Sequence, residues 1–172
     1  RFNGVMVGEA VSSQNKLHLW EERETKTVDT IVIHYISAVN ITPDTPFKLS
    51  AVLQNFIKYS VSSHYLISRR GCVYLMVPEE KKAWHCGPSK MPHPDNREKV
   101  NEFSLGIELL GMENRDFTCS QYNALAELCC DIESRYKKQF NYVGHDQIAG
   151  KEAVAKKLRI EPKIDPGSRF DW

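Results

Sequence analysis

The run Ile31-Val32-Ile33-His34-Tyr35-Ile36 has the length and the β-branched content of a buried strand. Alternation along an extended chain puts its residues on two faces, with Ile31, Ile33 and Tyr35 on one and Val32, His34 and Ile36 on the other. A polar ring nitrogen in such a strand needs a partner. A single histidine at a strand end is more often a hydrogen-bonded core residue than a metal ligand, so His34 alone leaves both readings open.

The C-terminal stretch gathers three further groups that can carry chemistry. His145 follows the short run Asn141-Tyr142-Val143-Gly144, and Lys163 and Asp165 come soon after it. Two imidazoles and one carboxylate are the ligand set of a catalytic zinc site, which keeps a fourth position open for water. Asp165-Pro166-Gly167 is also ordinary turn chemistry. Together with His34, this stretch indicates a possible zinc hydrolase.

The remaining patterns predict an α/β fold with a mixed central sheet flanked by helices. Residues 64–68 and 73–77 read as a hairpin with Gly71 in its turn, and 104–109 reads as a strand with a small face that leaves room beside Glu108. Thr45 and Pro46 are expected to begin one helix, and Thr118 with Gln121 forms the capping box of a longer one. We expect one domain over residues 30–172, preceded by an arm over 1–29 in which 12–15 is a loop and 21–26 a solvated charge run.

Bulk properties exclude several classes of function. The 172 residues carry 23 basic and 22 acidic side chains, which does not suggest a nucleic-acid binder. No apolar run reaches the roughly 18 residues of a transmembrane segment. Five cysteines without CxxC spacing are expected to be reduced packing residues. Because the first residue is Arg, we expect the natural start to have been removed, which leaves open whether the protein acts in the bacterial cytoplasm or in the periplasm and cell envelope.

Six blocks of sequence occur in a fixed order along the chain. They are Ile31-Val32-Ile33-His34-Tyr35, Val61-Ser62-Ser63-His64-Tyr65-Leu66-Ile67, Ala83-Trp84-His85-Cys86-Gly87, Ser104-Leu105-Gly106-Ile107-Glu108-Leu109, Gly144-His145-Asp146 and Lys163-Ile164-Asp165-Pro166-Gly167. This order resembles the zinc-dependent N-acetylmuramoyl-L-alanine amidases of the AmpD-like, type 2 amidase family, over about residues 30–172. The closing Phe170-Asp171-Trp172 is also similar to that family's ending.

The resemblance implies a peptidoglycan-recognition-like fold in which an open groove holds one Zn²⁺ per chain. It implies that His34, His145 and Asp165 are the ligands, that Glu108 is the general base and that Lys163 stabilises the oxyanion. The implied reaction cleaves the amide between the lactyl group of N-acetylmuramic acid and L-alanine, in peptidoglycan or muropeptides. Candidate substrate contacts are Tyr35, His64, Trp84, His85 and Asn101, although His64 and Trp84 are equally well explained as structural side chains.

The sequence departs from the family pattern after His145, where Asp146-Gln147 replaces Ser-Asp and about ten additional residues follow, around 151–162. This insert is expected to form a short amphipathic helix and could border the groove, or it could be a neutral surface elaboration. Two other functions stay open: a non-lytic peptidoglycan-binding module and a peptidoglycan deacetylase. We expect a monomer.

Overall fold

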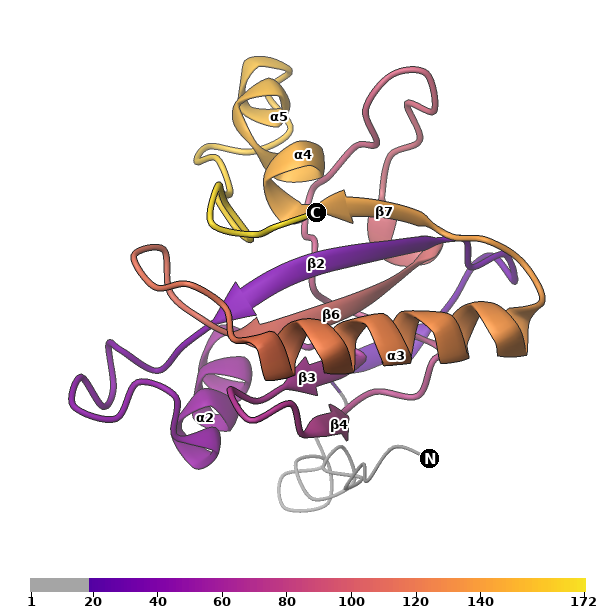
Figure 1. Ribbon diagram of the computed structural model, residues 1–172. Coiled ribbons are helices and arrows are strands. Elements are labelled where there is room, and N and C mark those ends of the chain that lie inside the picture. The colour runs from indigo at the N-terminus through magenta and orange to yellow at the C-terminus, as the bar shows by residue number, and fades with distance from the viewer. Residues whose placement is uncertain (1–18) are drawn as a thin grey trace.

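A computed structural model describes residues 19–172, which fold around a five-stranded mixed sheet (Figure 1). The strand order is β4-β3-β6-β2-β7. The bounds are β2 Thr30–Ile36, β3 Tyr65–Ile67, β4 Val73–Leu75, β6 Ser104–Leu110 and β7 Asn141–Gly144. β2, β3, β6 and β7 run parallel, and β4 closes one edge as the antiparallel half of a hairpin. The predicted α/β fold with a mixed sheet is therefore confirmed, and so is the hairpin.

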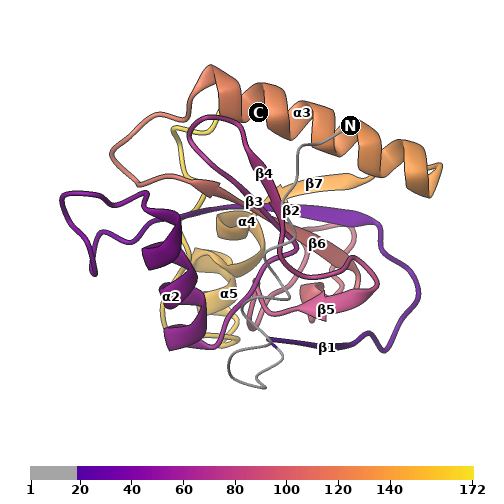
Figure 2. The ribbon, with the colours of Figure 1, turned by 90° about the horizontal axis from the view of Figure 1, so that it is seen from below.

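The part of the predicted arm that the structure describes is attached to the domain. β1 (Trp20–Glu22) pairs antiparallel with β5 (Lys81–Ala83), away from the main sheet (Figure 2). Next to β1, the guanidinium of Arg23 donates to the backbone carbonyls of four residues, which are Glu79, Asn101, Glu102 and Ser104. The predicted solvated charge run is therefore wrong at Arg23, whose charge satisfies buried carbonyl groups. The predicted loop at 12–15 lies outside the described residues.

Helices cover both faces of the sheet (Figure 2). α3 (Cys119–Tyr136) lies on one face and starts with the predicted capping box, in which Thr118 and Gln121 bond each other's backbone. α2 (Leu49–Tyr59) lies on the other face and begins three residues later than Pro46. The predicted start is wrong because the carbonyl of Pro46 accepts the N–H of Ala38, at 2.6 Å, and so closes a loop before the helix begins.

The two faces differ in the continuity of their apolar packing. Beneath α3, Ile31, Ile33, Leu105 and Ile107 join one large core. The opposite face holds two separate apolar clusters, one under α2 around Phe56 and another around Val32, Cys86 and Ile148. Short elements border the second cluster: η1 (Val100–Glu102), α4 (His145–Ala149) and α5 (Lys151–Ala155). His34 and Glu108 lie on this divided face, as the strand alternation predicts.

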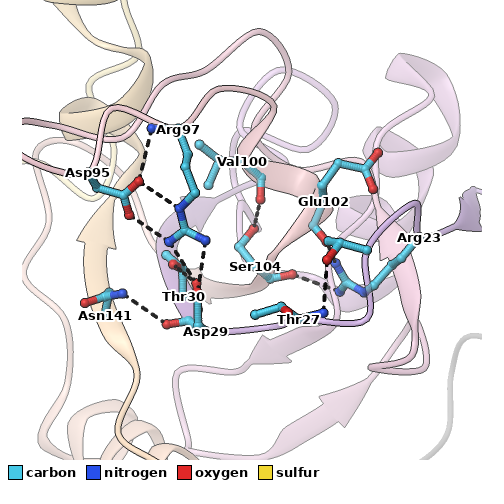
Figure 3. A network of polar contacts seen from close by, with 11 residues as sticks. Arg23, Thr27, Asp29, Thr30, Asp95, Arg97, Val100, Glu102, Ser104 and Asn141 are labelled. Atoms are coloured by element: carbon cyan, nitrogen blue, oxygen red, sulfur yellow. Dashed lines mark hydrogen bonds and ion pairs between the residues drawn. The ribbon is translucent and has the colours of Figure 1, made fainter.

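A polar network fixes the long loop that follows β5 (Figure 3). Arg97 forms ion pairs with Asp29 and Asp95 at 2.9 and 2.7 Å, and its guanidinium lies 3.9 Å from the ring centre of Phe103. Asp29 immediately precedes β2, and Phe103 immediately precedes β6. The loop is thereby held to the starts of the two central strands.

Two sequence expectations concern the chain as a whole. Within residues 19–172, no helix has both the length and the apolar character that crossing a membrane requires. All five cysteines are free. The prediction that the cysteines are packing residues is confirmed for Cys86 and Cys129, which are buried. It is wrong for Cys72, Cys119 and Cys130, which are exposed.

Candidate metal centre

Three side chains from distant parts of the chain converge on one point. His34 comes from β2, His145 is the first residue of α4, and Asp165 lies in the C-terminal loop. The Nδ1 atoms of the two histidines are 3.0 Å apart, and each is 3.1 Å from Oδ2 of Asp165. All three side chains are buried. The structure therefore brings together the three residues that the sequence suggested as metal ligands.

The contacts of His145 determine which of its nitrogens can bind a cation. Its Nε2 lies 3.0 Å from the carbonyl oxygen of Cys86. A carbonyl can only accept, so Nε2 carries the proton and donates it. In the neutral ring this leaves a lone pair on Nδ1, directed at His34 and Asp165. His34 is neutral, because burial, reinforced by the neighbouring His145, lowers its pKa to about 4.

The spacing of the three atoms fits a zinc ion. Nitrogen and oxygen ligands at the usual distance of about 2.0–2.2 Å in a tetrahedral site lie roughly 3.3 Å apart, close to the 3.0–3.1 Å here. Electron pairs on three such atoms repel one another unless a proton or a cation lies between them. The carboxylate supplies negative charge for a divalent cation. The donor set and its geometry thus fit Zn²⁺.

Glu108 lies beside this centre on the neighbouring strand. β2 and β6 pair so that Glu108 is directly opposite His34, and both point to the same face. Among the described residues, none lies within hydrogen-bonding distance of its buried Oε2 atom. Burial raises the pKa of Glu108 well above its ordinary value, and the charge of Asp165 raises it further. The positive charge of Lys163 opposes both effects, so the exposed Lys163 favours the carboxylate form.

The space that the strand glycine leaves is filled by His85. A Cβ at Gly106 would lie 2.5 Å from the His85 ring. This ring places Nδ1 3.0 Å from Nε2 of His34 and 3.1 Å from Sγ of Cys86. His34, His85 and Cys86 form a second group close enough to bind a metal. Burial raises the pKa of the Cys86 thiol well above its ordinary value, so this group lacks the negative charge that Asp165 gives the first.

The expected substrate contact of His64 is wrong, because its side chain is fully buried at 0% exposure. Its Nδ1 accepts the backbone N–H of Gly106, and its Nε2 donates to the carbonyl of Lys81, each at 3.0 Å. The pKa of His64 falls to about 3, mainly through burial and secondarily through the charge of Arg23. His64 is therefore a neutral structural residue.

Three other expected contacts, Tyr35, Trp84 and Asn101, keep partial exposure, and their positions differ. Tyr35 packs against the core beneath α3, and burial followed by the charges of Asp165 and Glu113 raises its pKa to about 12. Trp84 packs against the cluster under α2. The side-chain oxygen of Asn101 accepts the backbone N–H groups of His85 and Cys86, at 3.3 and 2.9 Å. Sequence reasoning did not find this loop-anchoring role of Asn101, for which the sequence carries no visible signal.

A cavity of about 680 Å³ opens next to Lys163. Its walls come from the residues after His145, from the segments on both sides of Asp165 and from the loops after β5 and β6. They include Pro92, Glu113, Asp146, Lys151, Pro162, Lys163 and Gly167. The helix predicted for the insert is confirmed only over α5, which ends before Leu158 and Ile160, and Ile160 is 93% exposed. Both ends of the insert contribute to the cavity wall. The insert therefore borders a hollow beside the metal centre.

Comparisons with known proteins agree with this arrangement. Residues 24–168 match the Amidase_2 family, described as N-acetylmuramoyl-L-alanine amidase. The 1,6-anhydro-N-acetylmuramyl-L-alanine amidase AmpD of Haemophilus influenzae is 32% identical over 90% of this chain and 84% of that protein. Alignments with five other curated AmpD proteins span only 54 or 55% of those proteins.

Two solved structures show the same fold. A crystal structure of a selenomethionine AmpD derivative superimposes with a TM-score of 0.71 and 30% identity, over 89% of this chain and 86% of that one. The amidase AmiD from E. coli, in complex with anhydro-N-acetylmuramic acid-L-Ala-D-gamma-Glu-L-Lys, gives a TM-score of 0.64 and 26% identity, over 88% of this chain and 58% of that one.

Proposed function

The chain belongs to the N-acetylmuramoyl-L-alanine amidase family and is an amidase, and from this premise we propose a zinc-dependent hydrolysis centred on His34, His145 and Asp165. The bond cleaved is the amide between the lactyl group of N-acetylmuramic acid and L-alanine of the stem peptide. The observation that carries the proposal is the convergence of two imidazole nitrogens and one carboxylate oxygen at 3.0–3.1 Å. Glu108 lies directly opposite His34 on the neighbouring strand.

The three ligands would hold Zn²⁺ through Nδ1 of each histidine and Oδ2 of Asp165. Bound there, Zn²⁺ supplies a Lewis acid that lowers the pKa of water toward about 7 and polarises a carbonyl group. Both histidines are buried, and burial lowers the pKa of His34 to about 4, so no imidazolium proton has to leave His34 before the cation binds. One zinc per chain satisfies the set.

Glu108 moves the proton in this proposal. Its carboxylate takes a proton from the attacking water and returns it to the nitrogen of the breaking C–N bond, so that L-alanine leaves as a neutral amine. The unpartnered Oε2 atom is available for this transfer, and the low polarity around it makes the protonated form accessible during the reaction. A carboxyl group with a raised pKa can both accept and donate near neutral pH.

Lys163 is proposed to stabilise negative charge on the oxygen of the attacked carbonyl. Its backbone N–H is bonded to the carbonyl of Ala149 at 2.9 Å, which fixes the segment between α5 and Asp165. Its side chain is exposed at the edge of the 680 Å³ cavity, and its charge reaches both His34 and Glu108. A cation at this position lowers the energy of an oxyanion more than that of the neutral amide.

We propose soluble 1,6-anhydro-muropeptides as the substrates, because the curated relatives are named for that class and AmiD was solved with such a compound. Tyr35, Trp84 and Asn101 remain candidate substrate contacts. The stem peptide is proposed to bind in the cavity beside Lys163. The protein is proposed to act as a monomer, since the ligand set and both catalytic groups come from one chain.

Digestion followed by mass spectrometry tests this function. Purified protein with its zinc content measured is incubated with an anhydro-muropeptide and, separately, with intact cell-wall sacculi. Free stem peptide from the anhydro-muropeptide is the expected result, with slower release from sacculi. Acetate release would identify a deacetylase instead, and binding without products would identify a recognition module. Protein that stays free of zinc yet releases stem peptide would contradict the metal dependence.

A further inference from the structure

We propose that a hydrogen-bond chain from Val100 through Ser104 and His85 fixes the tautomer of His34, so that its Nδ1 lone pair faces the metal. This inference rests on the proposed zinc site and makes His85 and Ser104 positioning residues. Neither residue would touch the substrate. The role replaces the substrate contact that the sequence suggested for His85, whose side chain is only 8% exposed.

The direction of the hydrogen bond is fixed at the Val100 end of the chain. Ser104 Oγ lies 2.7 Å from the carbonyl oxygen of Val100 (Figure 3). A carbonyl only accepts, so the hydroxyl proton of Ser104 points to it. The same Oγ atom lies 3.3 Å from Nε2 of His85 and has only acceptor capacity left. Nε2 of His85 must therefore be the protonated nitrogen.

The protonation of His85 determines which nitrogen of His34 carries the proton. A neutral His85 with its proton on Nε2 has a lone pair on Nδ1. Nδ1 is 3.0 Å from Nε2 of His34, which must supply the proton. Sγ of Cys86, at 3.1 Å from the same Nδ1 atom, can only add a second, weaker donor. His34 then carries its proton on Nε2 and its lone pair on Nδ1, facing His145 and Asp165.

Packing on several sides holds the plane of the His85 ring in place. Gly106 lies against one side of the ring, where any Cβ would approach to 2.5 Å. His34 and His64 make edge-to-face contacts with it, at centroid distances of 5.2 and 5.6 Å. The amide oxygen of Asn101 holds the backbone of His85. The acceptor that His34 needs is therefore held rigidly in place.

The two ligand histidines thus reach the same state by different routes. A backbone carbonyl, that of Cys86, sets the tautomer of His145, whereas a chain of two side chains sets that of His34. Groups that orient metal ligands typically change metal affinity by about 10–100-fold when removed. Only the route to His34 can be broken by mutation of a side chain.

Zinc affinity, measured by competition with a chromogenic chelator, tests the inference independently of turnover. His85→Phe keeps the ring volume and removes the acceptor, so we expect zinc binding about 10–100-fold weaker than in the wild type. His85→Gln keeps an acceptor and is expected to retain most of the affinity. Ser104→Ala should give a smaller loss. His93→Gln changes an exposed histidine and serves as the control, with unchanged affinity.

Unchanged zinc affinity in folded His85→Phe and Ser104→Ala proteins would overturn the inference. If these variants do not fold, nitrogen NMR on zinc-loaded wild-type protein still decides it, with His85 assigned by comparison with the other histidine signals. A proton on Nε2 of His85 and a lone pair on its Nδ1 support the chain, and a proton on Nδ1 of His85 refutes it. Wild-type protein that binds no zinc would instead contradict the proposed zinc-dependent function. Failure of the hydrogen-bond chain and failure of the proposed function therefore give different results.

Discussion

The two nitrogens of the His34 ring face regions that look alike in composition and differ in charge. Around Nδ1 lie His145 and Asp165, and around Nε2 lie His85 and Cys86. Both regions are buried, and each offers three ligand residues, counting His34, within reach of one cation. Nδ1 faces a carboxylate, with Glu108 and Lys163 nearby, whereas Nε2 faces a protonated thiol and a neutral ring.

The difference shows that proximity of ligand atoms does not by itself make a metal site. A cation leaving water must be compensated by negative charge, because desolvation of an unpaired ion is costly. Asp165 gives that compensation on the Nδ1 side. On the Nε2 side the Ser104 hydroxyl takes part in hydrogen bonding, and a proton occupies the place that a metal would need. In the proposed site, the Nδ1 side would bind the cation, and the Nε2 side would orient the ligand His34.

The largest effect is expected from Asp165→Ala, which removes the negative charge from the Nδ1 side. Zinc binding should weaken by more than the roughly 100-fold that outer groups cause, and amidase activity should fall with it. Inductively coupled plasma mass spectrometry after gel filtration gives the zinc content. Asp146→Asn is the matched control, since that half-buried carboxylate belongs to neither group, and its zinc content should stay at one per chain.

Glu108→Gln should separate catalysis from metal binding. The variant keeps zinc, because Glu108 is not one of the converging ligands, and loses about 10²–10⁴-fold in turnover, the usual contribution of a general base. Activity on an anhydro-muropeptide, measured beside zinc content, checks both halves. A Glu108→Gln protein with wild-type turnover would show that another group moves the proton.

Gly106→Ala should disturb the Nε2 side without touching a ligand. The new Cβ would meet the His85 ring at 2.5 Å, so we expect a loss of about 1–3 kcal/mol in the free energy of unfolding and weaker zinc binding. Gly111→Ala is the control, because its Cβ would meet Phe117 at 2.7 Å, in the core beneath α3. That variant should lose stability and keep its zinc affinity. Equal zinc affinities in the two variants would show that the position of the His85 ring does not affect metal binding.

Acid should destabilise the protein partly through His64, which lies behind His85. Because the pKa of His64 is about 3 in the folded chain against 6.5 as its ordinary value, the unfolded chain binds more protons between these pH values. Stability from this group is present above pH 6.5 and is lost as the pH falls, by about 2 kcal/mol at pH 5. Urea unfolding at pH 7.5 and 5, with a chelator present, should show a shallower pH dependence for His64→Gln than for the wild type.

The smallest effect on the metal is expected from Cys86→Ala. If the Nε2 side binds no cation, zinc stoichiometry and affinity stay unchanged, and the lost sulfur costs only about 1 kcal/mol of stability. Titration with zinc, followed by thermal unfolding, measures both. Binding of a second zinc by the wild type that disappears in Cys86→Ala would show that both sides of His34 hold metal.

Much of the fold could be predicted because local patterns and tertiary packing agree in it. The alternation in β2, the turn at Gly71 and the capping box of α3 are short-range features, and each appears as predicted. The start of α2 was misplaced because the carbonyl of Pro46 is used by Ala38, a partner outside the helix. Arg23 was misread for the same reason, since its acceptors lie more than fifty residues away.

The sequence by itself determined the order of the matched blocks, and with it the family; it also predicted the candidate set His34, His145, Asp165, Glu108 and Lys163. Tertiary structure alone decided what the remaining histidines do. Burial at 0% makes His64 structural, and the space beside Gly106 brings His85 within 3.0 Å of His34. The physical reason is that tautomer, pKa and access to solvent depend on the atoms around a ring, and packing of residues distant in sequence sets those atoms.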